Sequence, residues 1–165
     1  MAPTTNTNPA SLDYVRVFLR ASQRYLAEVL GEVPKRGQPV FQVDASLALQ
    51  EINISIGVTG DLRGLVNFGM DKPTLLAIAS TMMMENCTEL DELSISAVME
   101  LSNIISGNAR TGLSELGKFS DITPPTYFAG KAVVGSWHRM RAMSVPMILS
   151  KGTVFVTVGI RPRHD

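Results

Sequence analysis

Residues 90–116 read LDELSISAVMELSNIISGNARTGLSEL, and this stretch decides the fold of the chain. At about 100° per residue its apolar residues cover one broad side of a helix. That side is made by Leu93, Ile95, Ala97, Val98, Met99, Leu101, Ile104, Ile105, Leu113 and Leu116. The pattern predicts a long helix that buries its apolar side and leaves a narrow polar strip exposed.

The polar strip carries two functional groups among small residues. Glu100 and Asn103 are three residues apart, so their Cβ atoms lie about 5–6 Å from each other on one face. Ser96 and Gly107 leave room on either side for another molecule to close over this pair, and Arg110 extends the same strip. A solvated polar face with no further role has the same pattern, so the spacing alone leaves both interpretations open.

The composition predicts an ordinary globular protein. The chain has 165 residues, of which 45% are hydrophobic and 18% charged, with 15 basic and 15 acidic residues. That balance argues against a nucleic-acid surface, and the single cysteine, Cys87, excludes an internal disulfide. Residues 1–9 are polar and predicted to be disordered, without the apolar segment of a signal peptide. With no run of 18 apolar residues, we expect a cytoplasmic protein that does not contact membranes.

The first half of the chain predicts a helix followed by a hairpin. Ser11 is the expected N-cap of a helix that ends at Leu30 before Gly31, and residues 32–39 read as a loop. Residues 51–58 alternate strictly between isoleucine or valine and smaller or polar residues, which predicts a strand with one buried face. A turn at residues 59–61 leads into a second strand over residues 64–70.

The second half repeats this order. Asp71 is the expected N-cap of a short helix that runs to the methionines at 82–84, which we interpret mainly as core residues. Thr88–Asp91 has the form of a capping box that opens the central helix, and Gly117 ends it. Residues 118–131 contain two adjacent prolines and predict an extended loop. Two strands follow, over residues 139–149 and 153–160, and Pro146 marks an edge or a bulge in the first.

Two helix–loop–hairpin units therefore start at Ser11 and at Leu90. They predict an α+β fold with pseudo-two-fold symmetry, in which both hairpins join one antiparallel-rich sheet and about three helices pack on one face. An unpaired edge strand of such a sheet would be available for dimerisation.

Most enzyme templates do not match this sequence. It has no dinucleotide-binding or phosphate-binding glycine loop, no zinc spacing and no nucleophile elbow. His138 and His164 are the only histidines and stand far apart in the sequence. We therefore expect no metal site and no serine or cysteine nucleophile.

The central helix resembles a known family. Ser96-x3-Glu100-x2-Asn103 is similar to the D/S-x3-E-x2-N motif of the CheC/CheX phosphatases of bacterial chemotaxis. The resemblance extends to Gly57-Val58-Thr59-Gly60, Leu90-Asp91-Glu92-Leu93, Gly117-Lys118 and Asp121-Ile122-Thr123-Pro124-Pro125-Thr126, and covers roughly residues 10–160. The first helix has no E-x2-N, because its one glutamate, Glu28, is followed three residues on by Gly31. One site per chain resembles CheX more than CheC.

This resemblance implies a single CheX-like domain over residues 10–162, with phosphatase activity on the aspartyl phosphate of a CheY-type response regulator. Asn103 would hold the attacking water and Glu100 would meet the regulator's lysine, while Ser96, Gly107 and Arg110 would contact the receiver domain. No cofactor is expected on this chain, because Mg²⁺ would come with the partner. The resemblance also implies a homodimer that shares its sheet.

Two other functions stay open. The first is a non-catalytic module that binds a receiver domain in another two-component pathway. The second is a purely structural dimer.

Overall fold

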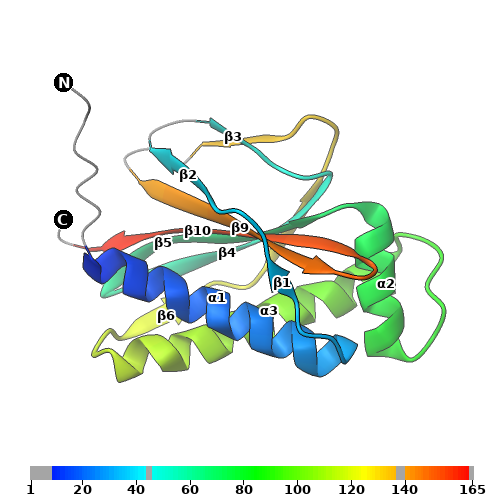
Figure 1. The fold of residues 1–165 in the computed structure, drawn as a ribbon, viewed down its shortest axis with the longest axis horizontal. Helices are drawn as coiled ribbons and strands as arrows, with labels where there is room; N and C mark the ends of the chain where they lie inside the picture. Colours follow the sequence, from blue (N-terminus) through cyan, green and yellow to red (C-terminus); the bar gives the residue numbers. More distant parts are fainter. Residues whose placement is uncertain (1–8, 44–45, 137–139, 164–165) are drawn as a thin grey trace.

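The structure is a computed structural model that describes residues 9–43, 46–136 and 140–163. In these residues three helices lie on one face of an antiparallel sheet (Figure 1). The helices are α1 (Pro9–Leu30), α2 (Lys72–Met83) and α3 (Glu92–Glu115). The predicted strand start at Arg139 and both histidines, His138 and His164, lie outside the described residues.

The sheet has the strand order β1-β9-β10-β5-β4-β6, with β2 also paired to β9 and β7 also paired to β4. Its strands are β1 (Lys35–Arg36), β2 (Val40–Val43), β4 (Ile52–Gly60), β5 (Leu62–Met70), β6 (Ser120–Ile122), β7 (Thr126–Ala129), β9 (Arg141–Leu149) and β10 (Gly152–Pro162). A separate two-stranded sheet is formed by β3 (Ser46–Ala48) and β8 (Val134–Ser136).

The two predicted helix–hairpin units meet at the centre of the main sheet. The hairpins β4–β5 and β9–β10 join where β5 and β10 pair antiparallel, with Val66 opposite Val158. Strands β1 and β2, after α1, pair with β9 of the second hairpin, and strands β6 and β7, after α3, pair with β4 of the first. This exchange confirms the predicted α+β architecture.

The alternation of residues 51–58 predicts the strand that the structure has as β4. The apolar face of β4 forms the core with the helices. That face consists of Ile52, Ile54, Ile56 and Val58, each at most 1% exposed. The prediction of only one buried face is wrong, because Asn53 and Asn67 on the other face are also buried. The side-chain carboxamide of Asn67 donates through Nδ2 to Asn53 Oδ1 at 3.0 Å. Its Oδ1 accepts from the Ser55 hydroxyl at 2.7 Å, so these groups are hydrogen-bonded despite burial.

Several helix ends follow the sequence signals. Helix α1 stops at Gly31, whose φ of 66° favours glycine, although the helix begins at Pro9 and not at Ser11. Asp71 caps α2 by accepting from the Thr74 amide at 2.9 Å, as predicted. Gly117, with φ of 75°, follows the last turn of α3.

The start of α3 differs from the prediction. The capping box is formed by Asp91 and Ser94, one turn after the predicted box at Thr88. Asp91 Oδ1 accepts from the Ser94 amide at 2.9 Å, and Ser94 Oγ accepts from the Asp91 amide at 3.0 Å. The Ser94 hydroxyl also donates to the Glu89 carbonyl at 3.0 Å, which holds the preceding turn outside the helix.

Both edges of the main sheet are built from short strands. The outer side of β9 is covered by β2 at residues 141–144 and by β1 at residues 147–148. Pro146, which has no amide hydrogen, lies in the gap between these pairings, and its carbonyl accepts from the Gly37 amide at 2.8 Å. The opposite edge consists of β6 and β7, of three and four residues.

Candidate functional site

The polar strip of α3 lies on the open side of the helix, as predicted. Ser96 and Glu100 are exposed, and Asn103 and Gly107 are half-buried. Among the described residues, neither the Glu100 carboxylate nor the Asn103 amide has a hydrogen-bond or ion-pair partner. A Cβ built on Gly107 would meet nothing within 4 Å. Four of the five predicted site residues therefore share one accessible face with two unsatisfied functional groups.

The fifth residue, Arg110, is bonded within the chain. Its Nε donates to the Ser120 carbonyl at 2.8 Å, and its Nη2 lies 3.0 Å from Asp121 Oδ1. These contacts join the end of α3 to β6, a role that the sequence does not predict, because Ser120 and Asp121 lie on a separate element. The side chain is 56% exposed, and its contact with a partner stays a prediction.

The segments outside the helix that resemble the family pack against each other. The Gly57 amide donates to Thr123 Oγ1 at 2.8 Å, and the Thr123 amide donates to the Gly57 carbonyl at 2.9 Å. A Cβ on Gly57 would lie 3.1 Å from the Thr123 methyl group, so the small residue permits this contact. The Phe119 amide in turn donates to Asp61 Oδ2 at 2.8 Å. These bonds fix residues 119–123, to which Arg110 attaches α3.

One apolar residue of α3 lies on a different side from the one that its sequence pattern predicts. The pattern places Leu93 on the buried side, but its side chain is 65% exposed. At about 100° per residue it lies only about 20° from Glu100 around the helix, because seven residues make nearly two full turns. Leu116, at the other end, is 49% exposed and is also outside the core. The helical angle measured from Glu100 alone is enough to find the position of Leu93.

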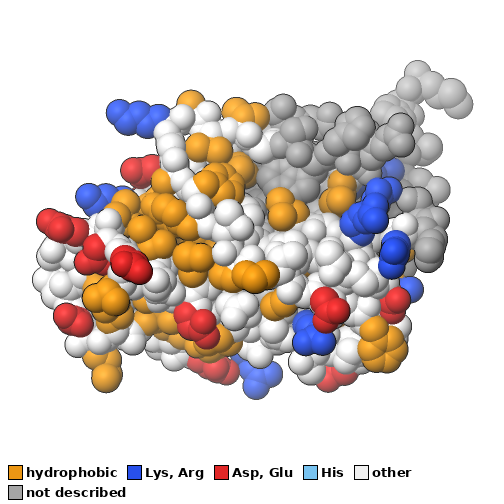
Figure 2. Space-filling model, turned by 180° about the vertical axis from the view of Figure 1, so that it is seen from behind, with side chains coloured by type: hydrophobic (Ala, Val, Ile, Leu, Met, Phe, Trp, Pro, Cys, Tyr) orange, Lys and Arg blue, Asp and Glu red, His pale blue; other side chains and the backbone are white. Residues whose placement is uncertain are grey.

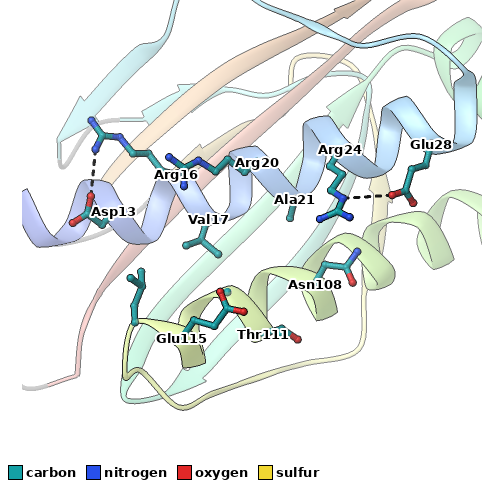
Figure 3. A pocket seen from close by; sticks show the side chains of 12 residues that line it. Asp13, Arg16, Val17, Arg20, Ala21, Arg24, Glu28, Asn108, Thr111 and Glu115 are labelled. Carbon is teal, nitrogen blue, oxygen red and sulfur yellow. Dashed lines mark hydrogen bonds and ion pairs between the residues drawn. The ribbon is translucent and has the colours of Figure 1, made fainter.

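A groove of about 710 Å³ runs between α1 and α3 (Figure 3). Its α1 side carries charged residues in two ion pairs, Arg16 with Asp13 at 3.3 Å and Arg24 with Glu28 at 3.5 Å. None of the five predicted site residues lines this groove. The candidate site is therefore the convex ridge of α3 and not a cavity, which suits a protein surface as the ligand better than a small molecule.

The described residues contain no group of three histidine, cysteine, aspartate or glutamate side chains placed to hold a metal ion. None of their helices is long and apolar enough to cross a membrane. The ridge thus offers a carboxylate and a carboxamide on a rigid helix. A carboxamide can both donate to and accept from one water molecule, and a carboxylate can pair with a cation.

Comparison with known proteins places the chain in a family. Residues 52–148 match the family described as chemotaxis phosphatase CheX. The CheY-P phosphatase CheX of Thermotoga maritima is 38% identical over 121 residues, which are 71% of this chain and 76% of that protein.

Solved structures have the same fold. CheX in the CheX-CheY-BeF3-Mg+2 complex from Borrelia burgdorferi superposes with a TM-score of 0.74 at 27% identity, covering 90% of this chain and 97% of that one. A CheX from Desulfovibrio desulfuricans gives a TM-score of 0.80 at 23% identity, covering 90% and 99%. With the family match and the Thermotoga relative, the chain belongs to the CheX family of chemotaxis phosphatases.

Proposed function

We propose that this protein hydrolyses the aspartyl phosphate of a CheY-type response regulator and so terminates a chemotaxis signal. The observation that carries the proposal is the pair Glu100 and Asn103, which are close on the accessible ridge of α3 and have no partner among the described residues. The named activity of the Thermotoga relative and the CheY partner in the Borrelia complex support it.

Asn103 would position the attacking water. Transfer of a phosphoryl group passes through a loose transition state, so orientation and charge stabilisation contribute more than a strong base. An aspartyl phosphate is already an activated acyl phosphate. A half-buried amide on a helix held by β6 has little freedom to move, which favours one fixed orientation of the water.

Glu100 would fix the docking register by pairing with the receiver's lysine. Its carboxylate is exposed and one turn away from Asn103, so both side chains can reach one shallow phosphate site. The Borrelia complex contains Mg²⁺ together with CheY and BeF3, which fits the expectation that the metal enters with the partner. Ser96 and Gly107 would allow close approach on either side of the pair.

The finer parts of this proposal are a cytoplasmic location, a homodimer formed through a sheet edge, and a place in two-component signalling. The edge strands that would pair between two copies of the chain are short, with two to four residues each. Light scattering at several protein concentrations tests it, and a monomeric mass at every concentration would remove this part while leaving the catalytic proposal intact.

The catalytic test follows the decay of a phosphorylated CheY-type receiver from the same organism in Mg²⁺. We expect the wild-type protein to accelerate decay and Asn103→Ala to slow that catalysed decay about a hundredfold, with unchanged affinity for the receiver. Asn108→Ala is the matched control, because Asn108 is an exposed asparagine on the same helix that faces the α1 groove.

Two results would contradict the proposal. Full activity of Asn103→Ala would remove the water-positioning role. Tight binding of the phosphorylated receiver by the wild-type protein without faster decay would favour the non-catalytic binding module.

A further inference from the structure

Leu93 has a large apolar side chain that is exposed to solvent in the first turn of α3. It follows the helix's first residue, and the reciprocal hydrogen bonds of Asp91 and Ser94 fix this turn. Its side chain is 65% exposed although Ser94, next to it, is fully buried. A leucine on a rigid backbone loses little conformational freedom on binding, so its burial by a partner would be favourable.

Leu93 belongs to the same face as the proposed catalytic pair. It lies about 20° from Glu100 around the helix and, at about 1.5 Å per residue, about 10 Å toward the N-terminus. Ala97 and Ile104, both half-buried, continue an apolar line beside the polar strip. A partner footprint of about 800 Å² centred on Glu100 has a radius of about 16 Å. A receiver that covers Glu100 therefore also covers Leu93.

The charge around Leu93 indicates what kind of surface it meets. Between Pro73 and Ala109 the sequence has five acidic residues and no lysine, arginine or histidine. The acidic residues are Glu85, Glu89, Asp91, Glu92 and Glu100. Figure 2 shows carboxylates and hydrophobic side chains on the side where α2 lies, at the left of that view, with lysine or arginine side chains above them. A complementary partner surface combines an apolar patch with lysine or arginine side chains.

We propose that Leu93 is an apolar docking residue for the receiver domain, which sets the affinity of the complex and leaves the chemical step unchanged. The partner surface opposite it carries an apolar patch with basic side chains around it. This inference rests on the proposed function only for the identity of the partner. It assigns to the first turn of α3 a separate contribution from that of Glu100 and Asn103.

The test compares Leu93→Ala with Leu116→Ala. Leu116, the C-cap residue of α3, is also an exposed leucine, but sixteen residues place it about 24 Å from Glu100, beyond the footprint, and it lines the α1 groove. Affinity is measured by titration with a CheY-type receiver activated by beryllofluoride and Mg²⁺. Decay of the phosphorylated receiver gives kcat and KM in parallel.

We expect Leu93→Ala to raise both Kd and KM about tenfold, which corresponds to about 1.4 kcal/mol, with kcat unchanged. Leu116→Ala should match the wild type, and raised salt should weaken wild-type binding. Wild-type affinity of Leu93→Ala, a fall in kcat alone, or equal effects of both variants would overturn the inference.

Its failure is distinguishable from that of the proposed function. If the wild type binds without accelerating decay and Leu93→Ala weakens binding, the catalytic proposal fails and the docking residue stands. If wild type and Leu93→Ala accelerate decay equally at every receiver concentration, the docking role of Leu93 fails and the catalytic proposal stands. If the wild type neither binds nor accelerates decay, both are overturned.

Discussion

Gly107 lies in the interior of α3, where a glycine costs about 0.5–1 kcal/mol relative to alanine. A Cβ added there would meet nothing within 4 Å, so the substitution introduces no clash inside the chain. Gly107→Ala should therefore stabilise the protein by about 0.5–1 kcal/mol. For a chain of this size that raises Tm by about 1–4 °C.

On the proposed docking surface, the same methyl group would occupy space that the receiver needs. Gly107 follows Asn103 by four residues and lies on the same face, one turn further along the helix. We expect Gly107→Ala to weaken receiver binding and Gly107→Leu to weaken it further, because the larger side chain reaches toward Asn103. Stability and activity should thus change in opposite directions, which a general folding defect would not produce.

Gly112 is the matched control on the same helix. A Cβ there would lie 2.8 Å from Val17 Cγ1, because α1 and α3 approach closely at this point. Valine has few alternative rotamers in a helix, so Gly112→Ala should lose about 1 kcal/mol or more through overpacking. Its folded fraction should still bind the receiver with wild-type affinity, because Gly112 lines the α1 groove and lies off the strip.

Urea unfolding at equilibrium gives the stability of each variant, and titration with the activated receiver gives its affinity. If Gly107→Ala is less stable than the wild type, the space next to Gly107 is not open. If Gly107→Ala is stabilised and yet binds and dephosphorylates the receiver as the wild type does, Gly107 is not part of the docking surface.

Arg110→Ala should lower the unfolding free energy by about 1–2 kcal/mol, because it removes the hydrogen bond to the Ser120 carbonyl and an exposed ion pair. Asp121→Asn should lose less, and unchanged stability of Arg110→Ala in urea would refute this internal role. The hydrogen bond from the Ser94 backbone amide is the main cause that lowers the pKa of the Asp91 carboxyl, and the adjacent Ser94 side chain adds to this effect. The charged cap therefore stabilises the fold above the ordinary carboxyl pKa and is lost as pH falls through the lowered value. Asp91→Ala should thus be less stable than the wild type near neutral pH, and a stability difference that does not narrow in strong acid would contradict the reasoning.

The local signals of the sequence predict most of the fold. The alternation at residues 52–58, the cap at Asp71 and the stop at Gly117 each depend on a few neighbouring residues, and the structure has all three. The N-cap of α3 is harder to predict from the sequence, because Thr88–Asp91 and Asp91–Ser94 are overlapping candidates for the capping box. The choice between them depends on the Ser94 hydroxyl bond to Glu89, which only the folded turn provides.

Contacts between distant segments explain the other differences. Asn53 and Asn67 tolerate burial because they hydrogen-bond across two strands, whereas the sequence pattern alone assigns Asn53 to a solvent face. The role of Arg110 likewise depends on Ser120, which reaches α3 only once β6 pairs with β4. The positions of Glu100 and Asn103 needed no such contact, since their spacing on one helix determines them.

The long sequence resemblance has a physical explanation in how α3 is held. Gly57 and Thr123 bond to each other, and Arg110 connects the neighbouring β6 to the helix. Gly57, Thr123 and Arg110 bond within the chain. Glu100 and Asn103, in contrast, have no partner among the described residues. An E-x2-N pair without the supporting segments would lie on a helix that is free to shift. Since a water molecule must be held in line with the phosphorus, a displacement of about 1 Å would cost about a hundredfold in rate. Thr123→Ala removes a contact of this support but no group of the proposed catalytic pair, and should therefore lower kcat more than it raises KM.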